Sequence, residues 1–243
     1  MKRIYSISFL GIFLLTLMTY PGYGQSIKRI LKRMIDAQGG PKVFESVKDM
    51  TMTGVVEMVQ QGISGTLTMY KKEPDKRRVD LEAMGRVIIQ AYDGQTVWWT
   101  NPQSGNTEEM SEQDAASMKR QSLPIVAILD PEKYGITFAY KGKEKIEGRD
   151  YHVLEQSHTD GYKMLRYVDA ETYLTGRSKS TRTGPGGIEI QVEQIMSDFK
   201  TVGGRTMAHS IVTYYNGEVF TKIAVEKVGF NSGLEDSLFK MDK

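Results

Sequence analysis

The chain of 243 residues contains no cysteine and only three histidines. Without cysteine it forms no disulfide and cannot carry a lipid on an N-terminal cysteine, so an ordinary hydrophobic core must hold it together. His152 and His158 fall on one predicted strand, about 20 Å apart if it is extended, and His209 lies much later. No HExxH or paired-cysteine motif is present. We therefore predict no metal site, no cofactor and ordinary surface histidines.

The chain also lacks an excess of charge of either sign. The formal net charge of +2 falls to 0 when Lys2 and Arg3 are removed with the leader described below. A neutral balance argues against nucleic acid as a partner. After the leader, no run is long and apolar enough to span a membrane. We expect a soluble mature protein in an extracytoplasmic space.

The N-terminus has the pattern of a secretory signal peptide. A basic start at Lys2 and Arg3 precedes an apolar run over residues 4–20, and Pro21-Gly22-Tyr23-Gly24 follows. We place cleavage after Gly24. An uncleaved anchor helix is the alternative, because the run approaches spanning length, but Pro21-Gly22 favours cleavage. Residues 25–243 are then enough for a single domain, and no linker or repeat divides them.

A helix is predicted over residues 26–38. Ser26 is a suitable N-cap, and Gly39-Gly40 ends the helical pattern. One face is apolar, with Ile27, Ile30, Leu31, Met34 and Ile35. The other face is basic, with Lys28, Arg29, Lys32 and Arg33. We interpret the basic face as solvated; attraction to an anionic membrane or partner is the alternative.

From Met50 onward the apolar pattern changes to period two, which indicates strands. Val79, Leu81 and Ala83 alternate with charged residues, as on a half-buried strand. Turn sequences separate the runs at Gln61-Gly62, Pro74-Asp75, Asp93-Gly94, Asp160-Gly161, 184–187 and Asn216-Gly217. The apolar positions slip by one between Val225 and Val228, which predicts a β-bulge or strand end near Glu226-Lys227.

Short helices interrupt the strands. Residues 111–114 form a capping box that starts a helix, and Lys119 and Arg120 suit its end. Residues 124–129 are apolar but too few to distinguish a buried strand from a helical turn. About ten or eleven strands predict a mainly β fold with short helices, built on one strongly curved antiparallel sheet. The interrupting helices are the candidates to cover its concave side.

No pattern for catalysis stands out. Residues 62–65 lack the spacing of a nucleophile elbow, and residues 184–187 are followed by neither Lys-Ser/Thr nor a helix, as a phosphate loop requires. The carboxylates are dispersed along polar strand faces. We therefore predict that the protein is not an enzyme.

Methionine is abundant, with fourteen in the chain, and Met52, Met58 and Met69 fall on predicted inward faces. Methionine is flexible and polarisable, so it fills cores and also suits adaptable apolar binding surfaces. Core filler is the ordinary interpretation; a lining for acyl chains is the alternative.

Four segments resemble the LolA/LolB-like superfamily of periplasmic lipoprotein carriers. The most specific is residues 92–102, Tyr-Asp-Gly-Gln-Thr-Val-Trp-Trp-Thr-Asn-Pro, which holds both tryptophans. The others are residues 70–74, residues 124–129 and residues 234–239. The resemblance covers most of the mature chain. It implies an unclosed β-barrel plugged by helices, with a cavity that takes up lipoprotein acyl chains or other apolar ligands.

The resemblance thus implies a periplasmic carrier that shields lipid or lipoprotein acyl chains, with membrane-bound donor and acceptor proteins as partners. A LolA-like sensor or scaffold that binds an envelope partner is the alternative. Residues 124–129 would form a lid. We expect the cavity lining to include Met52, Val56, Met58, Leu67, Met69, Val79, Leu81, Ile89, Trp98, Trp99, Ile125 and Ile128. Adjacent strand residues point to opposite faces, so one of Trp98 and Trp99 should face the cavity.

Glu73 departs from the family pattern. The carriers have an arginine before the proline, and it latches the lid by donating hydrogen bonds. An ionised carboxylate only accepts them. Either a lysine or arginine elsewhere pairs with Glu73, with Arg77 and Arg78 close to it in sequence, or the lid is unlatched. We expect the unlatched form, with Ile125, Val126, Ile128 and Leu129 loosely held.

Overall fold

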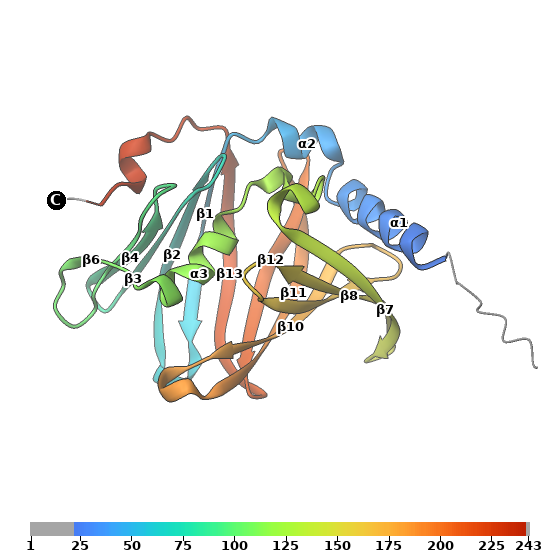
Figure 1. Cartoon of the computed structure of the whole chain (residues 1–243). Coiled ribbons are helices and arrows are strands. Elements are labelled where there is room, and N and C mark those ends of the chain that lie inside the picture. Colours follow the sequence, from blue (N-terminus) through green and yellow to red (C-terminus); the bar gives the residue numbers. More distant parts are fainter. Residues whose placement is uncertain (1–21, 242–243) are drawn as a thin grey trace, which may run out of the picture.

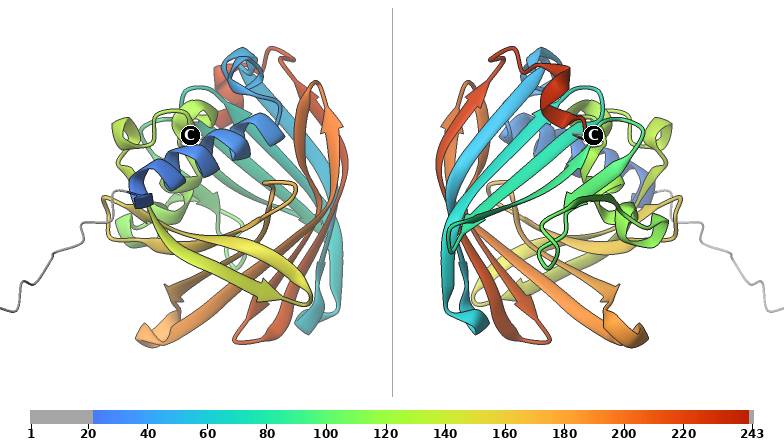
Figure 2. Two further views of the ribbon diagram at one scale, coloured as in Figure 1. Left: turned by 90° about the vertical axis from the view of Figure 1, so that its right-hand side faces the viewer. Right: turned by 90° about the vertical axis from the view of Figure 1, so that its left-hand side faces the viewer.

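The computed structural model describes residues 22–241, and the predicted leader lies outside this range except for its last residues (Figure 1). Within it, thirteen antiparallel strands form one sheet in the order β6-β5-β4-β3-β2-β1-β13-β12-β11-β10-β9-β8-β7. The edge strands β6 and β7 do not pair with each other, so the barrel is not closed. The sheet curves strongly, and helices cover its open side (Figure 2).

The strands are β1 (Asp49–Met58), β2 (Ile63–Lys72), β3 (Lys76–Ala83), β4 (Arg86–Tyr92), β5 (Val97–Thr100), β6 (Thr107–Glu109), β7 (Ile136–Ile146), β8 (Arg149–His158), β9 (Lys163–Asp169), β10 (Thr175–Thr183), β11 (Glu189–Val202), β12 (Arg205–Tyr215) and β13 (Glu218–Phe230). The α-helices are α1 (Gly22–Ala37), α2 (Pro41–Ser46) and α3 (Glu112–Ser122). Short 3-10 turns are η1 (Val59–Gln61), η2 (Ile125–Ile128), η3 (Glu132–Tyr134), η4 (Pro185–Gly187) and η5 (Asp236–Phe239).

A β-bulge lies where the first strand, β1, pairs with the last strand, β13, in the middle of the sheet. On β13, Lys227 pairs with Thr53 and Val225 with Gly54, so Glu226 is left over. This confirms the bulge predicted at Glu226-Lys227. A Cβ on Gly54 would lie 2.1 Å from the carbonyl oxygen of Ala224, so only glycine allows this close approach. Bulges increase local twist and bend a strand, which suits a curved sheet.

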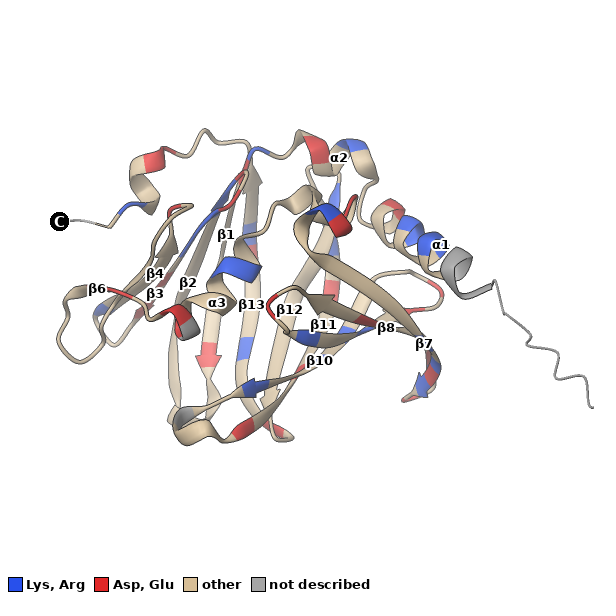
Figure 3. Ribbon diagram, viewed as in Figure 1, with Lys and Arg blue, Asp and Glu red and all other residues tan. Residues whose placement is uncertain are grey.

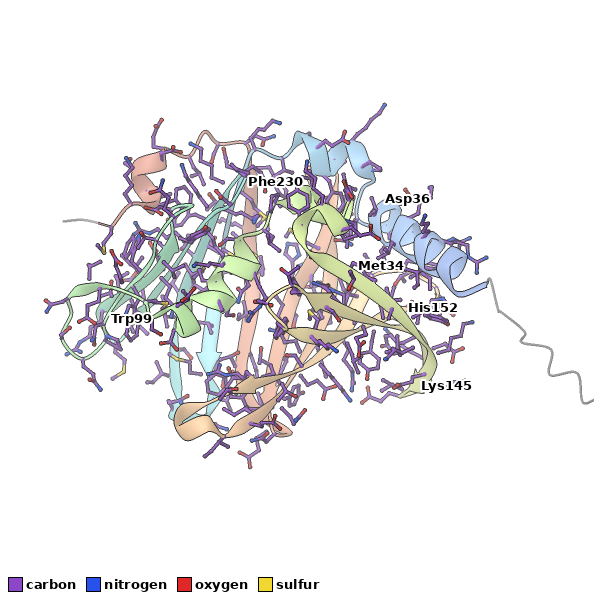
Figure 4. The ribbon with its side chains drawn as sticks, in the orientation of Figure 1. Met34, Asp36, Trp99, Lys145, His152 and Phe230 are labelled. Carbon is purple, nitrogen blue, oxygen red and sulfur yellow. The ribbon has the colours of Figure 1, made fainter. Side chains whose placement is uncertain are left out.

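Helices α1 and α3 pack on the sheet at two places. Ile30 and Met34 of α1 are buried against Leu154 and Val168 of β8 and β9; Figure 4 labels Met34 near His152 of β8. Ala115 and Met118 of α3 pack on Val97 of β5. The helices therefore cover the concave side, as expected.

The basic side of α1 faces solvent. Lys28, Arg29, Lys32 and Arg33 are all exposed (Figure 3). Lys32 pairs with Asp36 at 2.6 Å, and Arg33 lies over the ring of Tyr173. These contacts within the protein agree with a solvated helix face. No helix within residues 22–241 is long and apolar enough to cross a bilayer.

The C-terminal segment closes the opposite, convex face of the sheet. The Phe239 side chain of η5 is fully buried. Its carbonyl oxygen accepts a 2.8 Å hydrogen bond from Nε1 of Trp98, and Arg78 donates to the carbonyl of Leu238 at 2.8 Å. Phe239 therefore covers Trp98 of β5 on the outer, convex side of the sheet.

Asp49 anchors the start of that segment. Its carboxylate accepts hydrogen bonds from the backbone N–H groups of Ser232, Gly233 and Leu234 and from the Ser232 hydroxyl. Burial alone would raise the pKa of Asp49, but these hydrogen bonds lower it below its usual value. The ionised carboxylate thus ties β1 to the end of the chain.

Most local expectations are confirmed, with three differences. Helix α1 begins at Gly22 rather than at Ser26. Residues 22–241 form thirteen strands rather than ten or eleven, in part because β6 is three exposed residues with no apolar alternation to reveal it. His209 is buried rather than on the surface. Residues 124–129, whose short apolar run is compatible with either a strand or a helical turn, contain the 3-10 turn η2.

Replacing Phe239 by alanine should lower the free energy of unfolding by about 3–5 kcal/mol, the usual loss for a buried phenylalanine. Lys240→Ala, next to it and exposed, should change it by less than about 0.5 kcal/mol. Urea unfolding followed by circular dichroism measures both. Equal effects of the two variants would show that the C-terminal segment is not part of the folded unit.

Candidate functional site

The concave face carries a continuous apolar surface. Cross-strand pairs place Met52 opposite Met69 and Met69 opposite Val79. Leu67 lies opposite Leu81 on the same face, two residues along. Met52 and Val56 are buried, whereas Met58, Leu67, Met69, Val79 and Leu81 are half-buried and so remain reachable. These seven predicted lining residues therefore lie together on β1–β3.

Strand register separates the two tryptophans. Val97 packs on α3 and thus marks the concave face, and Trp99, two residues on, shares that face. Trp98 lies opposite Ala91, which lies opposite Arg78, and both Trp98 and Arg78 bond to the C-terminal segment outside the barrel. Trp99, labelled in Figure 4, is therefore the tryptophan on the concave side.

Two residues expected in the lining lie on the convex face instead. Trp98 is buried by η5, and Ile89 pairs with Asp80, on the same face as Arg78. Ile89 belongs to the run Val87-Ile88-Ile89, which does not alternate with polar residues, so the pattern does not reveal which face of the sheet Ile89 occupies. Its neighbour Ile88, opposite Leu81, is the residue that faces the concave side.

The segment that follows α3 is tethered to β2 through its backbone; we call residues 122–129 the lid. Nζ of Lys71 donates to the carbonyl oxygens of Ser122 and Leu123, at 3.0 and 2.6 Å. The N–H of Ile125 donates to both carboxylate oxygens of Glu73, at 3.0 and 3.2 Å. One cation and one carboxylate therefore hold the lid at three backbone groups within four residues.

The expectation of a loosely held lid is wrong. Glu73 cannot donate, but the lid offers it a backbone N–H, and Lys71 supplies the donor from the same strand end. Neither Arg77 nor Arg78 pairs with Glu73: Arg78 is bound to Asp80 at 2.7 Å, and Nε of Arg77 is buried without a hydrogen-bond partner among the described residues. Glu73 thus accepts a hydrogen bond from the lid, where the resemblance implied a donor at this position.

Burial perturbs the groups around this tether. It lowers the pKa of Lys71 to about 8, against the attraction of Glu73 and with the repulsion of Arg77 and Arg205. It raises the pKa of Glu73 above its usual value, although the Ile125 hydrogen bond and Lys71 act in the opposite direction. Nε of Arg77 and two guanidinium nitrogens of Arg205 are buried without partners among the described residues. The tether therefore sits in a poorly solvated, mostly positive environment.

A pocket of about 170 Å³ lies between the lid and β7–β9. Its apolar wall includes Ile125 and Ile128 of the lid, with Ile136 and Phe138 of β7. Its polar side comprises Arg120, Gln156, His158 and Arg166, which sequence reasoning missed. Within residues 22–241, no three His, Asp or Glu side chains gather in a way that could hold a metal ion.

Three of these four polar residues, Gln156, His158 and Arg166, could have been found from hairpin register. Gln156 and His158 share a strand face, and the Asp160-Gly161 turn folds β9 back on β8 so that Arg166 pairs with Leu154. Gln156 lies two residues from Leu154, so its side chain is on the same face of the sheet as those of Leu154 and Arg166. The signal was present, but it depends on the exact register of the hairpin.

Comparison with solved structures defines the fold. The chain is similar to a DUF1329 family protein from Desulfovibrio piger (16% identity, 88% of this chain and 97% of that chain, TM-score 0.60). It is also similar to the LolA superfamily protein NE2245 from Nitrosomonas europaea (14% identity, 88% of this chain and 97% of that chain, TM-score 0.61). A third similar structure is a putative outer membrane lipoprotein-sorting protein domain from Vibrio parahaemolyticus (16% identity, 87% of this chain and 94% of that chain, TM-score 0.57).

These likenesses show a LolA-like fold, which confirms the resemblance found in the sequence. At such low identity they establish the fold alone. No family model matches the chain, and no curated protein matches it either.

Glu73→Ala removes the acceptor for Ile125 and should release the lid. We expect amide hydrogen exchange of a peptide covering residues 123–129 to speed up roughly tenfold or more, since a charge-assisted hydrogen bond is worth about 1.5–3 kcal/mol. Glu82→Ala, on exposed β3 surface, is the matched control and should leave exchange unchanged. Unaltered protection in Glu73→Ala would show that this bond does not hold the lid.

Because of Lys71, the free energy of unfolding should change with pH in the alkaline range. Its pKa is about 8 when folded and close to its ordinary 10.5 when unfolded, so between these values the unfolded chain binds the extra proton. Stability should therefore rise from pH 8 to 10.5 by on the order of 3 kcal/mol relative to Lys71→Met. Urea titrations of both proteins at pH 7, 9 and 10.5 measure the difference. Parallel pH profiles would mean that Lys71 is not desolvated.

Proposed function

We propose that this protein is a periplasmic binding protein that shields a lipid or lipoprotein acyl chain on its concave face. The leader of residues 1–24 exports it, and residues 25–243 form the mature protein. The observation that carries the proposal is the half-buried apolar surface of β1–β3 beneath a lid held by only a few side-chain contacts. The names of similar LolA-like and lipoprotein-sorting proteins support the same class of ligand.

The energetics allow the ligand itself to open the lid. Releasing the lid gives up two hydrogen bonds from Lys71 and one to Glu73, at about 1.5–3 kcal/mol each. Burying a methylene group contributes about 0.8 kcal/mol, so roughly ten methylenes offset the whole tether. An ordinary acyl chain exceeds that length. The free energy gained by burying the acyl chain is then enough to open the lid, and uptake needs no other source of energy.

The two tryptophans provide the test, because they differ in face and not in position along the sheet. A brominated long-chain fatty acid should quench Trp99 in the Trp98→Phe variant strongly. Trp98 in the Trp99→Phe variant should be quenched little, because η5 covers it on the convex side. Fluorescence titration of both variants gives the comparison.

Equal quenching of the two variants, or none at saturating fatty acid, would contradict binding on the concave face. Circular dichroism of both variants serves as the control for folding, since Trp98 is buried and donates to Phe239. A folded Trp99→Phe variant with an unquenched Trp98 completes the expected pattern.

A further inference from the structure

The pocket under the lid contains a guanidinium without a counter-ion. Arg166 of β9 lines it, and its Nε donates to the side-chain oxygen of Gln156. Among the described residues, Arg166 has no ion pair and no other hydrogen bond. Asp160, the acid in the β8–β9 turn, is bound to Arg120 instead. Burial lowers the pKa of Arg166, yet an arginine stays charged at any physiological pH.

Gln156 fixes the direction of that guanidinium. Its oxygen accepts from Arg166, and its Nε2 lies 2.6 Å from Nε2 of His158. The amide nitrogen can only donate, so His158 accepts at Nε2 and is neutral, in agreement with the pKa of His158 being lowered by burial. With Gln156 only 5% exposed, the arrangement is held in place. The remaining N–H groups of Arg166 are left without protein partners.

Such a fork of free N–H groups matches the two oxygens of a carboxylate or phosphate. The opposite wall of the same pocket is apolar, formed by Ile136 and Phe138 of β7 and by Ile125 and Ile128 of the lid. A ligand that satisfies both sides must be anionic at one end and hydrocarbon beyond it. The pocket volume of about 170 Å³ suits a head group and its first carbons rather than a whole long chain.

We propose that Arg166, oriented by Gln156 and His158, binds the anionic head group, carboxylate or phosphate monoester, of an amphiphile whose chain continues along the concave face under the lid. The proposal rests on the proposed function and adds the chemical class of the ligand's polar end. Lys71, Arg77 and Arg205 near the tether, against Glu73, add positive potential on the same side of the sheet.

The test compares three twelve-carbon ligands, dodecanoate, dodecyl phosphate and dodecanol, at pH 8 and below micelle formation. Each displaces Nile red, a neutral probe, from the full mature chain. Wild type should bind the two anions at least tenfold more tightly than dodecanol. Arg166→Gln should abolish that preference and leave dodecanol within twofold of wild type, whereas Arg166→Lys should keep part of it. A preference between the two anions distinguishes a carboxylate from a phosphate head group.

Arg149→Gln is the matched control, because it makes the same change at the exposed, far end of β8; it should leave all three affinities unchanged. Equal affinity of wild type for dodecanoate and dodecanol, or an equal loss for all three ligands in Arg166→Gln, would overturn the head-group assignment. If Arg166→Gln fails to fold, the wild-type ratio of dodecanoate to dodecanol decides. Failure of every ligand to displace Nile red would overturn the proposed function itself.

Discussion

The bonds from Lys71 and Glu73 to the lid backbone are the contact on which the interior depends. They join the end of β2 to the segment after α3, and so fix the roof over both the apolar surface and the Arg166 pocket. Burial lowers the pKa of Lys71 and raises that of Glu73, so each charge is held at a cost. A tether of this kind specifies the position of the lid, and the desolvation of both charges offsets part of the stability that its hydrogen bonds contribute. It therefore suits a lid that must yield to a ligand.

The second constraint is the strict alternation of the sheet. One face carries Met69, Val79 and Trp99 toward the interior, and the other carries Trp98 and Arg78 toward η5. The C-terminal segment thus covers the convex face at β3–β5, while the concave face opposite remains reachable. Asp49 holds the start of that segment to β1, next to the strand pair where the bulge bends the sheet. The register of β3–β5 therefore explains both why the convex face is covered by the C-terminal segment and why the concave face stays accessible.

Local features of the fold were predictable because their causes are local. The Asp93-Gly94 turn, in which Asp93 accepts from the N–H groups of Gln95 and Thr96, follows from two residues. The Ser111 cap of α3 and the bulge at Glu226 likewise follow from short patterns. The helical cover of a curved sheet follows from its need to bury one face.

The site was harder to predict because its contacts are long-range. Trp98 is buried by Phe239, 141 residues away, so no local pattern reveals its face. The tether was missed because Glu73 binds a backbone N–H, which every non-proline residue has and no motif displays. Arg166 meets Gln156 only through the exact pairing of β8 with β9.

If the interior of this protein binds an amphiphile as proposed, the ligand should be present in protein taken from its native setting. Solvent extraction and mass spectrometry of protein purified without detergent from its own host give the decisive test. We expect a stoichiometric long-chain lipid with an anionic head group, lost from the Arg166→Gln variant. Protein that carries no lipid, and remains empty after incubation with total host lipid, would contradict it.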